Sequence, residues 1–512
     1  MQKTIIIAGI ALALIASSVF SFFGYIDTFR HPEKAQSPTS EQQAYLADYL
    51  NQTYPAKRTA VLKKLPYNTV DANLKIYAES AILIDTANGC ILYEKNADVA
   101  IPPASITKLF VMYIAFKEIE SGRISLNDVV PLPESSWAIN LPSDASLMFL
   151  GQGQIVTLRE LMQGLAIASG NDAAIAVATY ISGNVKDFVA RMNEEARNLG
   201  LTYTHFEEPS GYSEKNMTTA RELASFARTY INRYPQAIEE FHSLKEIEYP
   251  KKENLAPWMK NRGNSMAVKQ WNTNVLLRSL EGCDGLKTGF IYESGFNIAL
   301  TAKRNGNRYL SVTMRGPGRN SREGNTYRQK DGTTLMEWAF SSFADYIPLE
   351  HIAPAYSVPV TGAEEKFVRL VPAWTNIISV PHITGNTSLD AAKQVRVEVT
   401  KPAFIYGGTL AGQNYGQITY SLENVVLETV PLVADRSIMR AGAWGRFWGI
   451  IASHFLGAEN SSVPAQPAAG TATNGNAQTG ADTGAQTTES APNAAPSQPA
   501  APSQPAAPAS QN

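Results

Sequence analysis

The stretch AILIDTANGCILY, residues 81–93, decides the fold of the central part of this chain. Two apolar runs, 81–85 and 90–93, flank an Asn88-Gly89 pair. Asn-Gly favours tight hairpin turns, because the central residues of such turns need a positive φ. The stretch therefore predicts a β-hairpin.

The sequence after this hairpin carries both helix and strand signals. The continuously apolar run Leu109–Phe116 is typical of a buried helix. Thr157 and Glu160 form the capping box of another helix. A second hairpin is predicted around residues 305–306. Strands at both ends with helices between them predict one α/β domain over residues 76–345, with its helices packed on an antiparallel sheet.

The chain before this domain divides near residue 27. Lys3 and the apolar run 4–26 are typical of an export signal. The run is also long enough to span a bilayer, which takes about 20 residues. Residues 1–27 are therefore expected to be a cleaved signal peptide or an uncleaved anchor, and in both cases the body of the protein is exported. Residues 28–75 form a polar extension without an assigned function.

The chain after this domain has three parts. Residues 346–433 carry short apolar runs between Pro, Gly and Asn, which predict a small all-β sandwich. Residues 436–456 place Trp and Phe on one helical face with arginines interspersed, which predicts an amphipathic helix on a membrane surface. The alternative is a terminal helix docked on its own β domain. Residues 457–512 are rich in Ala, Pro and Gln, and we expect them to be disordered.

The composition argues against several classes of function. A net charge of -2 over 512 residues gives no electrostatic basis for binding nucleic acid. The two cysteines, Cys90 and Cys283, do not make a disulfide framework. Cys283 lies close before Lys287, but we interpret it as a buried thiol rather than a catalytic one. The sequence contains no phosphate-binding glycine loop and no plausible metal-ligand cluster, so we expect no cofactor and no metal.

Three short motifs in the α/β domain carry the chemistry. They are Ser-Ile-Thr-Lys at 105–108, Ser-Gly-Asn at 169–171 and Lys-Thr-Gly at 287–289. Ser105 and Lys108 share a face at the start of the buried helix. Burial lowers the pKa of a lysine, which lets its neutral amine act as a base beside a serine nucleophile. Together the motifs predict a serine acyl-transfer site, and the absence of Gly-x-Ser-x-Gly argues against a histidine-based hydrolase.

The chain resembles the low-molecular-mass penicillin-binding proteins, the serine-type D-alanyl-D-alanine carboxypeptidases, over about residues 80–430. Their signature contains the same Ser-x-x-Lys and Lys-Thr-Gly motifs. The segments that carry the resemblance are 103–109, 169–173, 272–277, 284–289, 295–297 and 322–323. The resemblance implies the α/β transpeptidase fold that these proteins share with serine β-lactamases, followed by the small β-sandwich domain.

The resemblance also implies a role for each catalytic residue. Ser105 is acylated and Lys108 is its general base. Ser169 relays a proton to the leaving amine, and Lys287 supports the Ser169 hydroxyl electrostatically. Asn171 orients Lys108 and the substrate amide.

Substrate binding is implied for residues of the Lys-Thr-Gly strand and one arginine. Thr288 and Arg322 bind the terminal carboxylate of the substrate, and Gly289 permits close approach of the backbone. The backbone N–H groups of Ser105 and Phe290 form the oxyanion hole. Many relatives have histidine where this chain has Phe290, which leaves the reaction possible but makes its pH dependence harder to predict.

The activity implied is removal of the terminal D-alanine from peptidoglycan stem peptides through an acyl-enzyme, with β-lactam antibiotics as covalent inhibitors. The expected location is the outer face of the cytoplasmic membrane of a bacterium. A D,D-endopeptidase acting on peptide cross-links is an alternative that the sequence cannot separate. A β-lactamase is disfavoured because no Glu-x-x-Leu-Asn lies between the second and third motifs, and a non-catalytic wall-binding protein because every motif residue is intact.

Overall fold

The computed structural model describes residues 21, 23–31, 36–54, 62–68, 72–260, 267–348, 356–382 and 388–456. Most of the N-terminal segment 1–27 and the tail 457–512 lie outside these residues, so the expectations for them remain predictions.

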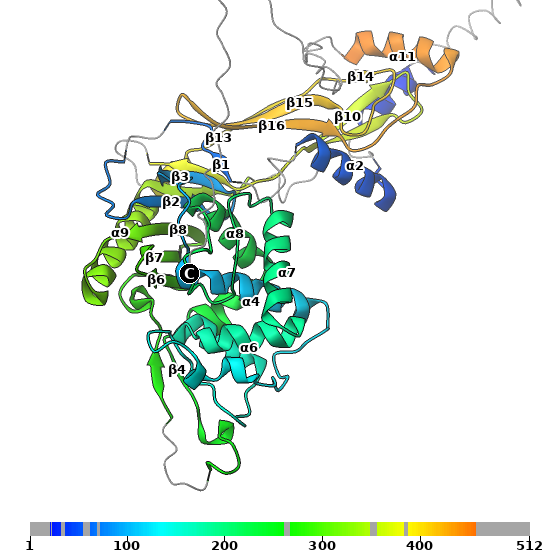
Figure 1. Ribbon diagram of the computed structural model, residues 1–512. Coiled ribbons are helices and arrows are strands. Elements are labelled where there is room, and N and C mark those ends of the chain that lie inside the picture. Colours follow the sequence, from blue (N-terminus) through cyan, green and yellow to red (C-terminus); the bar gives the residue numbers. More distant parts are fainter. Residues whose placement is uncertain are drawn as a thin grey trace, which may run out of the picture. The chain divides into compact units, whose positions relative to one another are not determined.

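A six-stranded sheet forms the centre of the α/β domain (Figure 1). Its order is β1-β3-β2-β8-β7-β6, and every neighbouring pair is antiparallel except β1 with β3. Both hairpins predicted from the sequence are confirmed, as β2–β3 and β7–β8. The strands are β1 (Lys63–Lys64), β2 (Ser80–Asp85), β3 (Cys90–Lys95), β6 (Cys283–Ile291), β7 (Gly295–Arg304) and β8 (Asn307–Gly316).

Helices cover both faces of this sheet. The alternation of side chains along a strand sends Ile82 of β2 toward helices α4 to α8, and Leu83 toward α9. Both faces of β2 are buried, which is why its residues 81–84 read as an unbroken hydrophobic run. The helices are α4 (Lys108–Glu120), α5 (Leu158–Gln163), α6 (Asn171–Ser182), α7 (Val185–Asn198), α8 (Ala220–Arg233) and α9 (Ser321–Ser342).

The predicted buried helix is α4. Its apolar residues 109–116 are all buried, and Phe110 stacks on Phe226 of α8 at 3.6 Å between ring centroids. The capping box predicted for α5 is also present: Thr157 accepts from the N–H of Glu160, whose carboxylate accepts from the N–H of Thr157.

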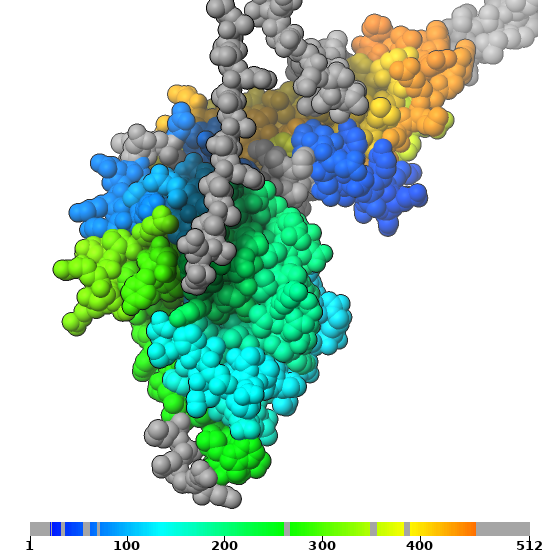
Figure 2. Space-filling view, in the orientation of Figure 1, coloured from blue at the N-terminus to red at the C-terminus, as the bar shows by residue number. Residues whose placement is uncertain are grey.

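A hairpin of β4 (Glu246–Glu248) and β5 (Lys269–Trp271) projects from the helical side of the domain (Figure 1). The segment after β4 packs along residues 151–155, where Asn254 exchanges hydrogen bonds with Ile155. A Cβ on Gly153 would lie 2.3 Å from the ring of Trp258, so that ring rests directly on the backbone. Figure 2 shows this green segment against the cyan part of the chain.

The C-terminal domain is rich in β-structure, as expected. A six-stranded sheet of order β13-β15-β16-β11-β10-β14 shares one hydrophobic core with the two-stranded ladder β9–β12. The short helix α10 (Ser388–Lys393) follows β12. The strands are β9 (Phe343–Tyr346), β10 (Tyr356–Thr361), β11 (Phe367–Pro372), β12 (Ile378–Pro381), β13 (Arg396–Thr400), β14 (Ile405–Tyr406), β15 (Asn414–Leu422) and β16 (Val425–Ala434).

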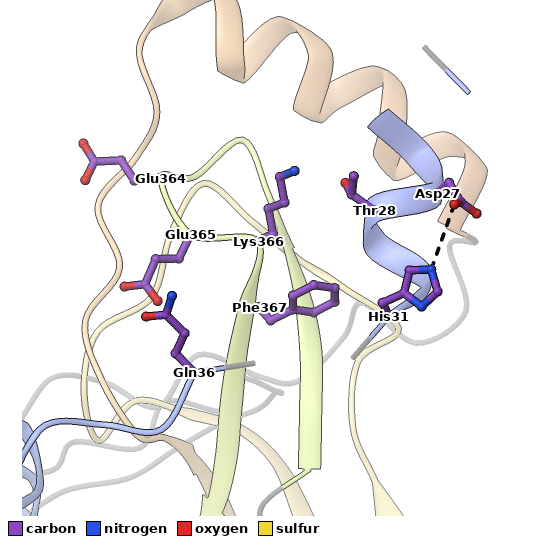
Figure 3. A pocket seen from close by; sticks show the side chains of 8 residues that line it. All are labelled: Asp27, Thr28, His31, Gln36, Glu364, Glu365, Lys366 and Phe367. Atoms are coloured by element: carbon purple, nitrogen blue, oxygen red, sulfur yellow. Dashed lines mark ion pairs between the residues drawn. The ribbon is translucent and has the colours of Figure 1, made fainter. Parts of the chain in front are cut away.

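Parts of the polar extension belong to this β-rich core. Helix α2 (Ser40–Thr53) is capped by Thr39 and buries Leu46 and Leu50 against the sheet. The short turn η1 (Thr28–Arg30) buries Phe29, whose ring lies 6.4 Å from that of Phe367. Figure 3 shows η1 facing residues 364–367 across a cavity of about 540 Å³.

The C-terminal helix α11 (Ala443–Leu456) is shorter than the predicted helix 436–456. Ile438 and Arg440 form β-bridges with Thr409 and Ala363, so this part of the chain extends the sheet before the helix begins. The helix packs closely through Gly449, where a Cβ would lie 2.3 Å from the N atom of Gly362. Among the described helices, none is long and apolar enough to cross a membrane.

Candidate active site

The first motif lies where a 3-10 turn, η3 (Ala104–Thr107), runs into α4. Ser105 is partly exposed, whereas Lys108, the first residue of α4, is completely buried. The two side chains meet as the sequence predicted: Lys108 Nζ donates to Ser105 Oγ at 3.0 Å. The turn at the start of the helix therefore brings an amine to the hydroxyl.

The Lys108 amine has three hydrogen-bond acceptors. Besides Ser105 Oγ, it donates to Asn171 Oδ1 at 2.8 Å and to the carbonyl of Ser210. Burial lowers the pKa of Lys108 to about 7, although the nearby carboxylates of Glu208 and Asp172 act in the opposite direction. The amine is therefore neutral in a large fraction of molecules near neutral pH, as a base must be.

The second and third motifs meet through another lysine. Lys287 Nζ, buried on β6, donates to Ser169 Oγ at 2.9 Å and to the carbonyl of Thr288 at 3.0 Å. Ser169 follows a π-helical turn, η6 (Gly164–Ala168), and has a φ of 58°. Burial, Lys108 and Arg328 together lower the pKa of Lys287. Two amines thus flank two serine hydroxyls.

Asn171 and Asp172 open helix α6 and fix the loop before it. The N–H of Asn171 donates to the carbonyl of Ser146 at 2.8 Å. The buried carboxylate of Asp172 accepts from the N–H groups of Met148, Phe149 and Leu150 at 2.8–3.0 Å. The amide that contacts Lys108 is therefore anchored to loop 146–150.

Two glycines let backbone approach the nucleophile. A Cβ on Gly289 would lie 2.6 Å from the carbonyl of Pro103 and 3.2 Å from the N atom of Ser105. A Cβ on Gly211, whose φ is +79°, would lie 1.9 Å from the carbonyl of Ala104. The Lys-Thr-Gly strand and residues 210–211 both press against the Ser105 turn, and neither position tolerates a side chain without movement.

The substrate-binding residues predicted from the sequence do not all lie close together. Thr288 lies beside Lys287, and its hydroxyl is 2.6 Å from that of Thr273. Arg322 lies in the exposed first turn of α9, and no side-chain contact links it to the three motifs among the described residues. Arg328, further along α9, is buried, and its Nη1 lies 3.4 Å from the Gly289 carbonyl and 3.3 Å from the Asn297 carbonyl.

Cys283 takes no part in this arrangement. Burial raises the pKa of its thiol to about 11, which leaves it protonated and weakly nucleophilic. The sequence reasoning missed Glu208, Ser210 and Arg328. A Pro-Ser-Gly run at 209–211 signalled a turn, but no sequence pattern linked that turn to Lys108.

This arrangement, with a buried lysine on a serine and a second serine–lysine pair beside it, defines a serine acyl-transferase of the penicillin-recognising class. The sequence matches the D-alanyl-D-alanine carboxypeptidase family over residues 67–318. It is 31% identical to D-alanyl-D-alanine carboxypeptidase DacD of Salmonella typhimurium, over 72% of this chain and 89% of that protein. It is 28% identical to DacF of Bacillus subtilis, over 71% of this chain and 87% of that protein.

The structure is also similar to solved structures of this class. It matches penicillin binding protein 5 from Haemophilus influenzae with a TM-score of 0.61 at 27% identity, over 72% of this chain and 100% of that one. The chain belongs to the D-alanyl-D-alanine carboxypeptidase family, and it is a serine-type enzyme of that family. The α/β transpeptidase domain and the C-terminal β-rich domain expected from the sequence are confirmed.

Proposed function

We propose that this enzyme removes the terminal D-alanine of peptidoglycan stem pentapeptides through an acyl-enzyme on Ser105. The observation that carries the proposal is the 3.0 Å hydrogen bond between Lys108 Nζ and Ser105 Oγ, on an amine whose pKa is lowered to about 7. Neutral Lys108 takes the proton of Ser105 as its Oγ attacks the carbonyl of the penultimate D-alanine. The tetrahedral oxyanion is bound by the N–H groups of Ser105 and Phe290.

The Ser169–Lys287 pair delivers a proton to the leaving group. Ser169 Oγ, held by Lys287, passes its proton to the leaving D-alanine amine and takes up the proton that Lys108 removed from Ser105, which leaves Lys108 neutral again. Asn171 keeps both Lys108 and the substrate amide oriented. The acyl-enzyme is then hydrolysed by water, with Lys108 acting as base again. β-Lactams enter the same path, because Ser105 opens their ring and the leaving nitrogen stays attached to the acyl group.

Replacing the nucleophile tests this assignment. Ser105→Ala removes the attacking oxygen and leaves the fold intact, so fluorescent penicillin should no longer attach covalently and D-alanine release from a pentapeptide should stop. Mass spectrometry of the labelled wild type should find the adduct on Ser105, and Ser341→Ala, on the exposed surface of α9, is the control. Native labelling of Ser105→Ala would disprove the role.

The terminal carboxylate of the substrate requires a cation. Thr288 and Gly289 line the strand that would receive it, and the sequence assigned the charge to Arg322. An exposed guanidinium binds a carboxylate weakly because water competes, whereas a guanidinium held beside the strand loses less entropy. We therefore assign the larger share to Arg328, whose Nη1 already lies 3.4 Å from the Gly289 carbonyl.

The two arginines can be compared directly. Arg328→Ala should raise KM for a pentapeptide by about tenfold or more, which corresponds to loss of a charge-assisted hydrogen bond. Arg322→Ala should change KM by less than about threefold. The reverse order of effects, measured by D-alanine release, would return the role to Arg322.

A D,D-endopeptidase would use the same chemistry on peptide cross-links. The purified enzyme should therefore be given a pentapeptide and a cross-linked dimer in parallel. D-Alanine release from the pentapeptide at the higher kcat/KM supports the carboxypeptidase, and faster release of monomer from the dimer supports the endopeptidase. Rapid turnover of penicillin itself would instead favour a β-lactamase.

We also propose that residues 436–456, now narrowed to α11, hold the enzyme on the outer face of the cytoplasmic membrane. Trp444, Phe447 and Phe455 are each at least half exposed, at 73%, 50% and 61%. Arg446 lies among them on a helix without Asp or Glu. This composition suits a helix lying in the bilayer interface. The buried residues Gly449 and Ala452 attach the opposite face to the β-rich domain.

Truncation separates the two possible anchors. A chain ending at Ala441 keeps the strand bridges of Ile438 and Arg440 but lacks α11. We expect it to move into the soluble fraction, with a mature N-terminus from which the export signal has been removed. Retention in the membrane fraction, with Met1 still found by mass spectrometry, would show instead that the N-terminal apolar run is the anchor.

A further inference from the structure

The chain between Glu208 and Ser213 forms the back wall of the Lys108 site. The carbonyl of Ser210 accepts a hydrogen bond from Lys108 Nζ, and Gly211 presses against the Ser105 turn. This wall supplies one of the three acceptors of the amine, and the other two belong to Ser105 and Asn171. A group that holds the Ser210 carbonyl in place therefore also determines the orientation of the Lys108 amine.

The carboxylate of Glu208 fixes Ser210. Its Oε2 accepts from both the N–H and the hydroxyl of Ser210 at 2.6 Å each. Its Oε1 accepts from the N–H of Ser213 at 3.3 Å and from Asn216 Nδ2 at 3.2 Å. Among the described residues, no Arg, Lys or His forms an ion pair with Glu208. This carboxylate is held by neutral donors.

The same network reaches the other side of the lysine. Asn216 is fully buried, and its Nδ2 also donates to Thr107 Oγ1 at 3.3 Å. Thr107 directly precedes Lys108, so Glu208 is connected both to the turn that carries the lysine and to the carbonyl that the lysine contacts. Asn216 Oδ1 in turn accepts from the N–H of Glu207 at 2.7 Å, which links Asn216 back to the residue before Glu208.

Three charged or titratable groups face the Lys108 amine. Glu208, from loop 208–213, and Asp172, from α6, are both negative and stabilise its protonated form. Lys287, from β6, is the neighbouring amine, and the charge of Lys108 contributes to the lowered pKa of Lys287. Asp172 also accepts hydrogen bonds from loop 146–150. Glu208 is therefore the negative group whose hydrogen bonds support only the wall of the Lys108 site.

We propose that Glu208 is a positioning residue for the general base: it holds the Ser210 carbonyl on Lys108, and its charge raises the pH above which Ser105 can be acylated. The proposal rests on the proposed role of Lys108. Removing the negative charge disfavours protonated Lys108, so the neutral base is present at lower pH. The acid limb of the acylation profile then moves down, by about 0.5–1 pH unit for a partly exposed carboxylate.

The experiment is a pH profile of penicillin acylation. The second-order rate constant for a fluorescent penicillin would be measured from pH 5 to 9 for the wild type, Glu208→Gln, Glu208→Asp and Glu214→Gln. Glu214 is an exposed glutamate that directly follows loop 208–213 and serves as the matched control. Thermal melting of each variant shows that it is folded over this range.

The expected outcomes distinguish charge from geometry. Glu208→Gln should move the acid limb to lower pH, while Glu214→Gln leaves it in place. Glu208→Asp keeps the charge but is shorter, so the limb should stay while the plateau rate falls about tenfold. A Glu208→Gln limb identical to that of the wild type would overturn the proposal.

A failure of this inference can be told from a failure of the proposed function. If Ser105→Ala loses its label and Lys108→Met loses acylation while the Glu208→Gln profile does not move, only the role of Glu208 is wrong. If Glu208→Gln does not fold, Glu208→Asp still decides: an unchanged plateau rate would contradict the positioning role.

Discussion

Lys108→Met should reduce the acylation of Ser105 by penicillin by about 10³-fold or more at pH 8. Methionine fills the space of the lysine stem but cannot accept a proton, and general base catalysis typically contributes 10²–10⁴-fold. The partly exposed Ser105 Oγ can turn to water, but the buried Asn171 Oδ1 and Ser210 carbonyl would lose their donor, so the rate is measured below the melting temperature of the variant.

The wild-type pH profile provides the companion measurement. Because the pKa of Lys108 is lowered to about 7, the neutral fraction and hence the acylation rate should rise with pH through about 7 and then reach a plateau. Lys303→Met, on the exposed end of β7, is the control and should leave both rate and profile unchanged. A Lys108→Met enzyme with a rate within tenfold of the wild type would exclude this lysine as the base.

Asp172→Ala should lower the free energy of unfolding by about 3 kcal/mol or more. Three backbone N–H groups of loop 146–150 would lose their acceptor inside the protein, and each buried unsatisfied group costs about 1–3 kcal/mol. The loss is read from thermal and denaturant unfolding. Glu194→Ala, an exposed glutamate on α7, should change stability by no more than about 0.5 kcal/mol.

The same substitution should also slow the reaction. Loop 146–150 carries the Ser146 carbonyl that holds the N–H of Asn171, and Asn171 in turn contacts Lys108. Penicillin acylation measured below the melting temperature should therefore fall as well. A variant with wild-type stability would show that this carboxylate is not a structural support of the loop.

The parts of the fold that depend on local patterns could be predicted. The two hairpins, helix α4 and the capping box of α5 each follow from residues adjacent in sequence. The start of α11 could not be predicted, because the bridges at Ile438 and Arg440 depend on strands far away in the chain. The helical spacing of the apolar residues does not show that a sheet edge binds the first part of this segment and keeps it out of the helix.

The candidate site likewise contains contacts that could be predicted from the sequence and contacts that could not. Ser105 and Lys108 meet because they are one turn apart, and the sequence shows that spacing. The Ser169–Lys287 contact spans 118 positions and followed only from resemblance to a family. Glu208 acts on Lys108 through the backbone carbonyl of Ser210. Because every residue type has a backbone carbonyl, no pattern of side chains in the sequence predicts this contact.

The docking of the N-terminal extension has a consequence for folding. Leu46 and Leu50 of α2 pack on the β-rich core, Arg369 donates to Ser37 at 2.9 Å, and Arg436 to the Gln36 carbonyl at 2.8 Å. These two hydrogen bonds join residues that are 332 and 400 positions apart. Contacts of such sequence separation form late, because closing the intervening loop costs entropy before any contact is gained. Until then α2 leaves its apolar face uncovered.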